Sequence, residues 1–217
     1  MARESKDELK MRANRVAAIL ATAYPDAHCH LKYSNPLEMS VATILAAQCT
    51  DAKVNEVTAS LFRKYRTAKD YAEAKQEALE KEIRPTGFFR NKAKSVRNFC
   101  AAIIEKHGGE VPGTIEELTG LPGIGRKSAN LIMSCSFGKP GIIVDTHVRR
   151  VAPRLGLTNE SDPDKIEVDL NKLVPEKERA DFSFRLADHG RAICHPRKPE
   201  CGGCPLNKVC PSAFTFD

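Results

Sequence analysis

Apolar residues recur every three or four positions along most of the chain, which is the spacing of helices that bury one face. The first such segment begins at a capping box of Ser5 and Glu8 and ends near Tyr24-Pro25, where the proline halts the helix. No segment shows the sustained alternation of apolar and polar residues that is typical of a strand. The pattern therefore predicts an all-α fold.

Two further helices follow with clear start signals. Asn35 is expected to be the N-cap of a helix that has Pro36 at its first position. The body of this helix, MSVATILAAQ, is apolar almost all round, which predicts a buried helix. Thr50 or Asp51 is expected to cap the next helix, which runs to about Tyr65.

The later segments differ in how strongly they favour a helix. Residues 70–81 are rich in Ala, Glu and Lys and predict a weak, exposed helix. Residues 84–87, with Pro and Gly, are typical of a loop, and Phe88-Phe89 then opens a basic helix. Further on, Asp162-Pro163 begins one helix, and another is expected from about residue 176 to residue 194.

Residues 111–150 contain a helix-hairpin-helix pattern. Thr114 begins a short helix, which Gly120 is expected to end in the left-handed conformation. The tight turn LPGIG follows, and Arg126 begins a second helix. A glycine turn before a helix N-terminus presents unpaired backbone N–H groups to an anion such as phosphate, although many Pro-Gly turns only connect helices.

Two residues near this hairpin carry groups suited to catalysis. Lys127 lies in the first turn of the second helix, where the helix dipole and Arg126 both favour the neutral, nucleophilic amine. Asp145 lies between the apolar run GIIV and a helix that starts at Thr146. It can serve simply as the N-cap of that helix, but a carboxylate is also a proton acceptor.

The positive charge is unevenly distributed along the chain, whose net charge is +6. Residues 84–100 contain five basic side chains and no acidic one, and residues 121–156 contain six basic side chains and a single carboxylate, Asp145. Residues 160–181, by contrast, carry eight acidic and four basic side chains. Any one such run is often just solvated surface. Two basic runs around a hairpin of this kind favour a nucleic-acid interface.

The N-terminal segment and the cysteines bear on the cellular compartment. The segment MARESKDELK lacks the apolar core of a signal peptide, and no apolar run reaches the length of a membrane span. A cytoplasmic location is therefore expected, and the eight cysteines are expected to be thiols or metal ligands. Cys100 and Cys135 lie in apolar stretches and are expected in the core, and His28-Cys29-His30 is expected to have a linking or packing role.

The last four cysteines lie close together in the pattern C-x6-C-x2-C-x5-C, at Cys194, Cys201, Cys204 and Cys210. This density in a reducing compartment indicates a metal site. Zinc sites normally use two closely spaced pairs, whereas only one pair here has that spacing, and the ferredoxin pattern does not fit either. Two disulfides remain a poor alternative.

The motifs LPGIGRKSAN and VDTHVRRV, followed by this cysteine tail, resemble the endonuclease III family of helix-hairpin-helix DNA glycosylases. The resemblance extends from about Asn35 to Pro211. It implies that Lys127 and Asp145 are catalytic and that the four cysteines hold a 4Fe–4S cluster. It also implies two helical domains with a DNA-binding cleft between them. One would span residues 29–139, with the hairpin motif at about 114–136, and the other residues 1–28 plus 140–217, with the cluster loop at 194–210.

The function implied by the resemblance is that of a bifunctional DNA glycosylase and abasic-site (AP) lyase in base excision repair. It would remove oxidised pyrimidines from double-stranded DNA through a Schiff base on Lys127 and then cleave the strand by β-elimination. The family uses a glutamine in a similar AQxTD context to fill the gap left by an extruded base, a role that falls on Gln48. Phe88 could be a wedge that enters the duplex, although core packing is the commoner fate of a phenylalanine. The full set of expected DNA contacts is Gln48, Phe88, Leu121, Gly123, Gly125, Arg126, Arg150, Arg197 and Lys198.

The expected protein is a monomer associated with the nucleoid, and two other functions stay open. A related glycosylase specialised for mismatches would share the hairpin, the aspartate and the cluster, but its monofunctional members replace the lysine. A DNA-binding module with a redox-sensing cluster would need neither Lys127 nor Asp145. The presence of both residues favours the enzyme.

Overall fold

The computed structural model describes residues 4–216, and this part of the chain is helical with no strand, which confirms the all-α prediction. Met1–Arg3 and Asp217, the ends of the predicted domains, lie outside the described residues. The chain forms two compact units. One spans His30–Lys139, and the other combines the N-terminal segment up to Cys29 with the segment that starts at Pro140. None of the described helices is long and apolar enough to cross a membrane.

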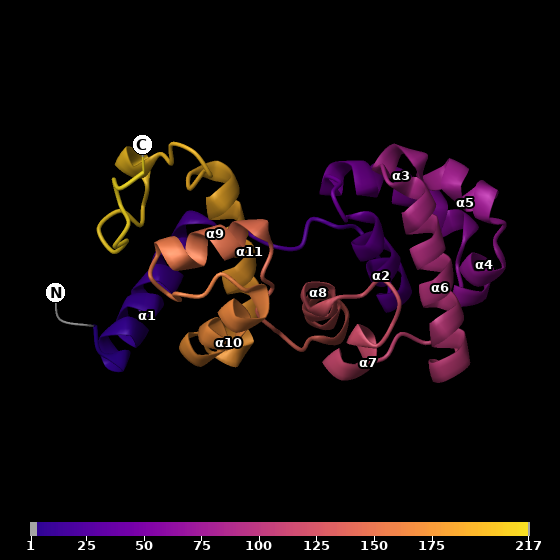
Figure 1. The fold of residues 1–217 in the computed structure, drawn as a ribbon, viewed down its shortest axis with the longest axis horizontal. Coiled ribbons are helices and arrows are strands. Elements are labelled where there is room, and N and C mark those ends of the chain that lie inside the picture. The colour runs from indigo at the N-terminus through magenta and orange to yellow at the C-terminus, as the bar shows by residue number, and fades with distance from the viewer. Residues whose placement is uncertain (1–3, 217) are drawn as a thin grey trace. The chain divides into compact units, whose positions relative to one another are not determined.

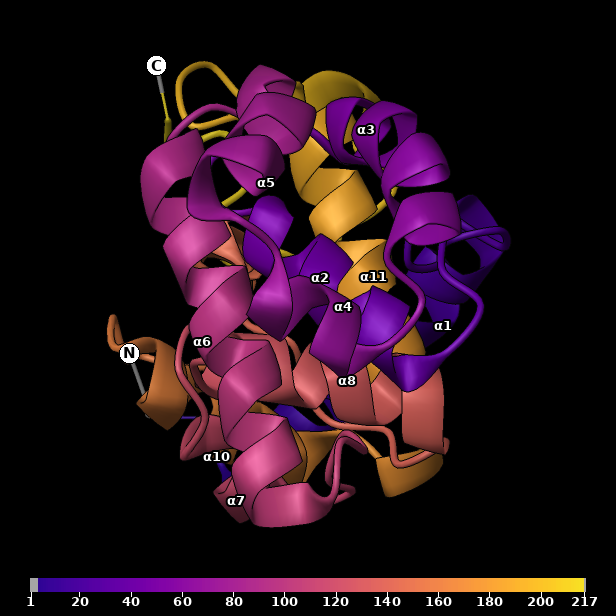
Figure 2. The same cartoon turned by 90° about the vertical axis from the view of Figure 1, so that its right-hand side faces the viewer.

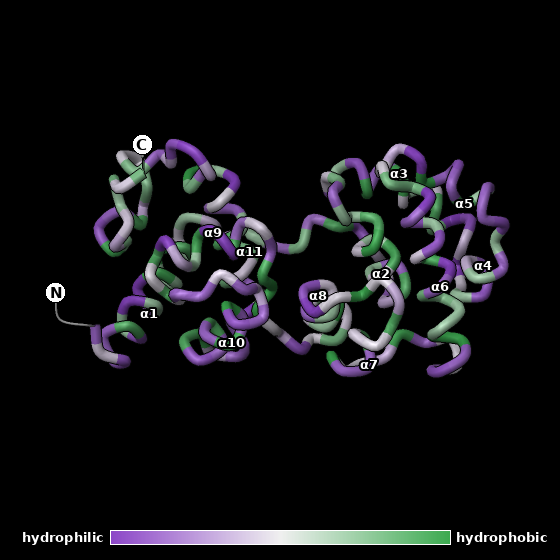
Figure 3. The backbone as a smooth tube through the Cα atoms, viewed as in Figure 1, coloured by the Kyte–Doolittle hydropathy of each residue, from purple (hydrophilic) through white to green (hydrophobic). Residues whose placement is uncertain are grey.

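The unit of residues 30–139 is built around two helices, α6 and α8, and the helices packed against each of them (Figures 1 and 2). The long helix α6 packs along α4 and α5, and α8 packs against α2 and α7. In α2 every residue from Met39 to Leu45 is buried, as the apolar sequence predicts, and the tube is green over most of this helix in Figure 3. The helices are α2 (Pro36–Leu45), α3 (Asp51–Lys64), α4 (Ala68–Glu73), α5 (Gln76–Ile83), the 3-10 turn η1 (Arg84–Thr86), α6 (Phe89–His107), α7 (Ile115–Thr119) and α8 (Arg126–Phe137).

Helix starts in this unit follow the local sequence. The Asn35 side chain accepts a hydrogen bond from the Glu38 backbone N–H at 2.9 Å, and Thr50 caps α3 in the same way. The prediction of one exposed helix over residues 70–81 is wrong. Two helices replace it, with a break at Ala74-Lys75, because Tyr71 and Leu79 are both buried and each helix turns its own apolar face inward.

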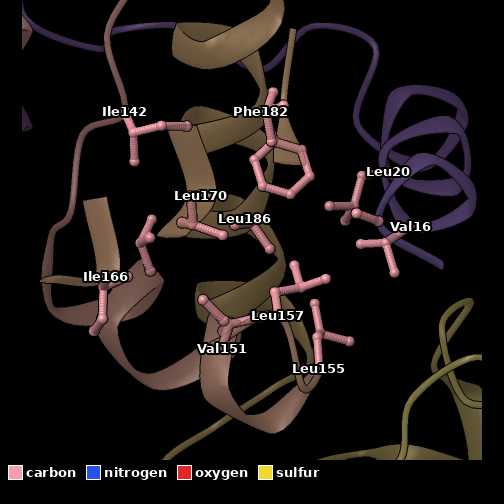
Figure 4. Close-up of a cluster of buried hydrophobic side chains, with 14 of the residues drawn as sticks. Val16, Leu20, Ile142, Val151, Leu155, Leu157, Ile166, Leu170, Phe182 and Leu186 are labelled. Atoms are coloured by element: carbon pink, nitrogen blue, oxygen red, sulfur yellow. The ribbon is translucent and has the colours of Figure 1, made fainter. Parts of the chain in front are cut away.

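The second unit encloses a separate core (Figure 4). The capping box of Ser5 and Glu8 is present at the start of its first helix, whose last residue is Ala23 and whose C-cap is Tyr24, close to the predicted end. The helix predicted from residue 176 begins as a 3-10 turn and becomes α-helical only at Arg179. The elements of this unit are α1 (Lys6–Ala23), α9 (Thr146–Arg154), α10 (Pro163–Leu173), η2 (Glu176–Glu178), α11 (Arg179–Ala192) and η3 (Cys201–Gly203).

The hairpin between α7 and α8 reverses at a different glycine from the one predicted. Gly120 is right-handed, with φ −76°, because its backbone N–H still donates to the Glu116 and Glu117 carbonyls at 3.2 Å. The prediction of a left-handed end at Gly120 is therefore wrong. Gly123 supplies the left-handed residue, with φ 82°, and a Cβ there would lie 3.3 Å from the Cβ of Ser95.

Replacing Gly123 with alanine should therefore destabilise the protein. An L-residue in the left-handed region costs about 1–2 kcal/mol, and the contact with Ser95 adds to this. The measurement is the free energy of unfolding in urea. Gly125→Ser is the control, since φ is −94° there, no atom lies within 4 Å of the new Cβ, and serine is a good N-cap. Equal stability of the two variants would show that the strain at position 123 is absent.

Candidate functional site

Buried and exposed residues alternate along the hairpin, and this pattern leaves part of its backbone exposed. Leu121 and Ile124 are 4% and 5% exposed, whereas Pro122, Gly123 and Gly125 are exposed. Gly125 is the N-cap of α8 and offers no side chain to the first-turn N–H groups. These amides are available to an anion such as phosphate. Because its side chain is in the core, Leu121 can contact DNA only through its backbone.

Lys127 lies in the first turn of α8 and is exposed. Two residues further along, Ala129 begins the run of buried positions that fixes the rotation of the helix, from Ala129 to Met133. Another lysine of this unit, Lys139, has its amine bonded to the Gly113 carbonyl at 2.8 Å. The hairpin thus carries an accessible amine next to an anion-binding helix start.

Asp145 belongs to the other unit, where it is the N-cap of α9. One carboxylate oxygen, Oδ1, accepts hydrogen bonds from the backbone N–H groups of His147 at 2.9 Å and Val148 at 2.7 Å. The capping role that the sequence allows is therefore present. Since Oδ1 makes both of these bonds, Oδ2 remains outside the cap and is the oxygen suited to chemistry.

Gln48 and Phe88 share an uncommon backbone conformation. Their φ angles are 51° and 46°, in the left-handed region that residues other than glycine rarely adopt. Both side chains are exposed, and Phe88 retains 63% of its accessible surface. A large apolar side chain held outward at this cost is not a packing residue. Core packing therefore does not explain Phe88.

Phe89 has a different environment from its neighbour. It is half-buried, and the guanidinium groups of Arg84 and Arg90 lie 5.8 Å and 5.7 Å from the centre of its ring. Cation–π contacts of this length hold both arginines beside the turn that carries Phe88. Two of the five basic residues in the run predicted from the sequence thus lie beside the turn that carries this exposed aromatic side chain.

The four C-terminal cysteines line one pocket. The rest of its lining is largely apolar and includes Leu155, Ile193, Pro199, Ala213 and Phe216. Among residues 4–216, no three His, Cys, Asp or Glu side chains converge as the ligands of one ion would. In a 4Fe–4S cluster each thiolate binds a different iron atom, so four sulfurs spread around one pocket fit such a cluster. Cys135, predicted in the core, is instead half-buried in α8, whereas Cys100 is buried as predicted.

The four cysteine thiols have different environments. The Arg154 guanidinium donates to Cys194 Sγ at 3.4 Å and lies 4.1 Å from the ring centre of Phe216. Burial raises the pKa of the Cys204 and Cys210 thiols. Their deprotonation therefore has to be coupled to metal binding, which releases the protons.

His189 lines this pocket and is 1% exposed. Burial lowers its pKa to about 4, so the ring is neutral at pH 7. A neutral imidazole can accept from the Tyr24 hydroxyl at Nδ1, 3.0 Å away, and donate from Nε2 to Cys204 Sγ at 3.7 Å. The ring therefore links α1 to a cluster ligand.

Three basic residues expected to contact DNA lie close to the cysteine segment. Arg197 and Lys198 are exposed, and Lys198 adopts a left-handed φ of 49°. Arg150, however, is engaged inside the unit: its guanidinium donates to the Cys194 carbonyl at 3.0 Å and to the Gly190 carbonyl at 2.8 Å. The structural role of Arg150 was not evident from the sequence, and a DNA contact by this residue stays a prediction.

Sequence reasoning missed Lys92, a charged residue that is only 5% exposed. It sits four residues before the buried Val96 on the apolar stripe of α6. A lysine at a core-facing position of an otherwise apolar stripe is the signal that could have identified it.

The class of protein follows from comparison with known families. Residues 41–176 match the model of the HhH-GPD superfamily of base excision DNA repair proteins, and residues 194–210 match the iron-sulfur binding domain of endonuclease III. Endonuclease III of Synechocystis sp. is 49% identical over 94% of both chains, and that of Bacillus subtilis is 45% identical over 86% of both. The chain therefore belongs to the endonuclease III family, and its cofactor is a 4Fe–4S cluster.

Solved structures agree with this assignment. A non-covalent endonuclease III–DNA complex and a trapped endonuclease III–DNA covalent intermediate each superpose with a TM-score of 0.90 at 43% identity. Each match covers 95% of this chain and 97% of the other. A thermostable thymine-DNA glycosylase shares the fold with a TM-score of 0.85 at 24% identity.

Loss of one cluster ligand should lower the yield of folded protein. Cys201→Ser removes a thiolate and with it metal-coupled folding energy, so its folded yield should fall more than that of the control Cys135→Ser, whose thiol lies in α8.

Freshly purified wild-type protein should be yellow-brown, with broad absorbance near roughly 400 nm and about four irons per chain. Stoichiometric zinc without that absorbance would overturn this assignment.

Proposed function

We propose that Lys127 is the nucleophile and Asp145 the catalytic carboxylate of a DNA glycosylase and AP lyase that acts on oxidised pyrimidines. As a member of the endonuclease III family, the protein is a base excision repair enzyme, and DNA is its partner. The observation that carries the assignment is the exposed amine of Lys127, one turn from the glycine hairpin. The related trapped complex is described as covalent, which requires a nucleophile on the enzyme of that complex.

The reaction has two stages at the sugar. The neutral amine of Lys127 attacks C1′ of an extruded nucleotide, the bond from C1′ to the base breaks, and the base leaves with a proton. The nitrogen now bound to C1′ becomes a Schiff base as the sugar ring opens. Loss of a proton from C2′ then expels the 3′ phosphate by breaking the C3′–O bond, and hydrolysis of the Schiff base frees the lysine.

Asp145 has two tasks in this scheme. It assists deprotonation of the attacking amine, and it stabilises cationic character at the sugar as the base departs. The oxygen that we assign to these tasks is Oδ2, since Oδ1 is committed to the start of α9. The cap holds the carboxylate in one orientation, so its capping and chemical roles are compatible.

Gln48 and Phe88 open the duplex in this scheme. Phe88 enters the base stack as an apolar wedge, and Gln48 fills the gap that the extruded base leaves. Their exposure and left-handed backbones support these roles. Arg126, Arg150, Arg197, Lys198 and the backbones of Leu121, Gly123 and Gly125 would contact the DNA.

The remaining expectations belong to the same proposal. Oxidised pyrimidines or abasic sites in double-stranded DNA would be the substrates, and the enzyme would act as a monomer in the cytoplasm, on the nucleoid. We further propose that residues 29–139 and residues 1–28 plus 140–217 are the functional domains, one carrying the hairpin and the other the cluster. Incubation of the pure protein with a panel of duplexes, each with one lesion, tests the range of bases removed.

The hairpin amides predict a specific binding defect. Gly125→Val should weaken affinity for a duplex with an abasic site, because the branched side chain would occupy the space through which a phosphate approaches the start of α8. No protein atom lies within 4 Å of the added Cβ, so the fold should be kept. Affinity of the wild type should fall steeply with salt, since phosphate neutralisation releases counterions. An unchanged affinity in a folded Gly125→Val protein would mean that the hairpin only connects two helices.

The role of Lys127 can be tested by chemical trapping. Borohydride reduces a Schiff base, so wild-type protein should form a covalent adduct with abasic or damaged DNA. Lys127→Ala should abolish both the adduct and strand cleavage, while lesion affinity is retained because phosphate contacts supply most of the binding. The readouts are the amount of adduct on a denaturing gel and the dissociation constant.

Two comparisons make this test decisive. Asp145→Asn keeps the size and part of the cap but loses the carboxylate, so it should slow base removal in a folded protein. Lys139→Ala is the matched control, because that amine is already bonded to the Gly113 carbonyl. Base removal by the wild type without any trappable adduct would place the enzyme in the monofunctional class.

A further inference from the structure

We propose that Lys92 is a positioning residue for base extrusion: its buried ammonium group fixes the turn that holds Phe88 outward. The inference rests on the wedge role proposed above for Phe88. Lys92 itself is 5% exposed, so it acts through the turn and not by touching DNA.

Residue 92 holds the turn by two separate hydrogen bonds. Its Nζ donates to the Thr86 carbonyl at 2.7 Å, and its backbone N–H donates to the Phe88 carbonyl at 3.0 Å. The two acceptors lie on either side of Gly87. Lys92 therefore holds both ends of the reversing segment, at Thr86 and at Phe88, by hydrogen bonds. The segment ends at the proposed wedge, Phe88.

The clamped segment needs such support because its backbone is strained. Gly87 has a positive φ of 70° with an extended ψ of 164°, which glycine adopts freely, and Phe88 follows in the left-handed region at φ 46°, where a side chain is strained. Phe88 is 63% exposed, so packing of its own side chain cannot stabilise this conformation. The anchor lies on the other side of the turn, where Thr86 is 2% exposed and its hydroxyl donates to the Ile83 carbonyl at 2.8 Å.

The buried ammonium group of Lys92 also supports a positioning role. A buried ammonium is normally paired with a carboxylate, but the acceptor here is a peptide carbonyl. Burial lowers the pKa of Lys92, and the nearby Cys49 thiol acts in the opposite direction. Cys49 directly follows Gln48, so the same ammonium lies within electrostatic reach of the loop that carries the second proposed intruding residue.

A double-mutant cycle with Phe88 separates positioning from general stability. Lys92→Met keeps the length of the side chain but leaves the Thr86 carbonyl without its donor. The substrate is a duplex with one thymine glycol, and the measurement is the single-turnover rate of base removal. Lys92→Met should be slower by about tenfold, which corresponds to roughly 1.4 kcal/mol of activation free energy. Phe88→Ala should be at least as slow, and the double variant should be no slower than Phe88→Ala, because both changes remove one function.

A second substrate supplies a readout that a loss of stability would not change. With a preformed abasic site in an unpaired bubble no base has to leave a stack, so Lys92→Met should cleave it within about threefold of wild type. Lys106→Met, an exposed lysine near the end of the same helix, should match wild type on both substrates. If Lys92→Met folds poorly, Lys92→Gln replaces it in the double-mutant cycle with Phe88→Ala, because glutamine retains a neutral hydrogen-bond donor.

The outcomes distinguish this inference from the proposed function beneath it. If Phe88→Ala is slow and Lys92→Met is as fast as wild type, Phe88 is a wedge and Lys92 does not position it. If the two defects multiply in the double variant, Lys92 supports the fold in general and the positioning role is wrong. If Phe88→Ala itself matches wild type, the wedge role fails and the positioning role fails with it.

Discussion

The burial of Leu121 and Ile124 is the contact on which the exposed side of the hairpin depends. These two side chains anchor the hairpin in the core, and the residues between and after them are left exposed. The first amides of α8 therefore face outward from a rigid support and not from a mobile loop. Lys127 takes its direction from the same support, because the buried positions from Ala129 onward fix the rotation of α8. The first-turn amides of α8 and the proposed nucleophile Lys127 thus both depend on one apolar contact.

The residues that we propose to enter the duplex face a different physical problem, since their side chains are exposed and not packed in the core. Gln48 and Phe88 both occupy the left-handed region, which costs on the order of 1–3 kcal/mol for such residues. The local sequence would not select this conformation. Tertiary contacts have to maintain it, and at Phe88 these are the buried groups of Thr86 and Lys92. The backbone conformation of the exposed Phe88 is therefore determined by hydrogen bonds of the buried Thr86 and Lys92.

The sequence predicts this molecule well wherever the determining contact is local. The caps at Asn35, Thr50 and Asp145 were predictable because each side chain bonds an N–H group two or three residues away. The reversal at Gly123 and the helix break near residue 74 were not, since packing against other elements decides both. In the candidate site, the motifs and the family resemblance predict roles for Lys127, Asp145 and the four cysteines. They could not predict the groups that contact these residues, such as Arg154, whose partner Cys194 lies 40 residues away in the sequence.

The cluster segment and the helix of Asp145 are connected by those supporting groups. Helix α9 starts at the Asp145 cap, and its last turns carry Arg150 and Arg154, which donate to the Cys194 carbonyl and to its sulfur. Arg154 also donates to the carbonyls of His195 and Pro196, at 2.6 Å and 2.9 Å. Between residues 194 and 210 the chain has only a short 3-10 turn of regular structure, and ligation of the four cysteines would add to the hydrogen bonds that hold it. A loosened loop would release the carbonyls that hold the end of α9, and the carboxylate at its start would lose its fixed position. These hydrogen bonds connect the cysteine segment to the helix that starts at Asp145, the carboxylate that we propose as catalytic.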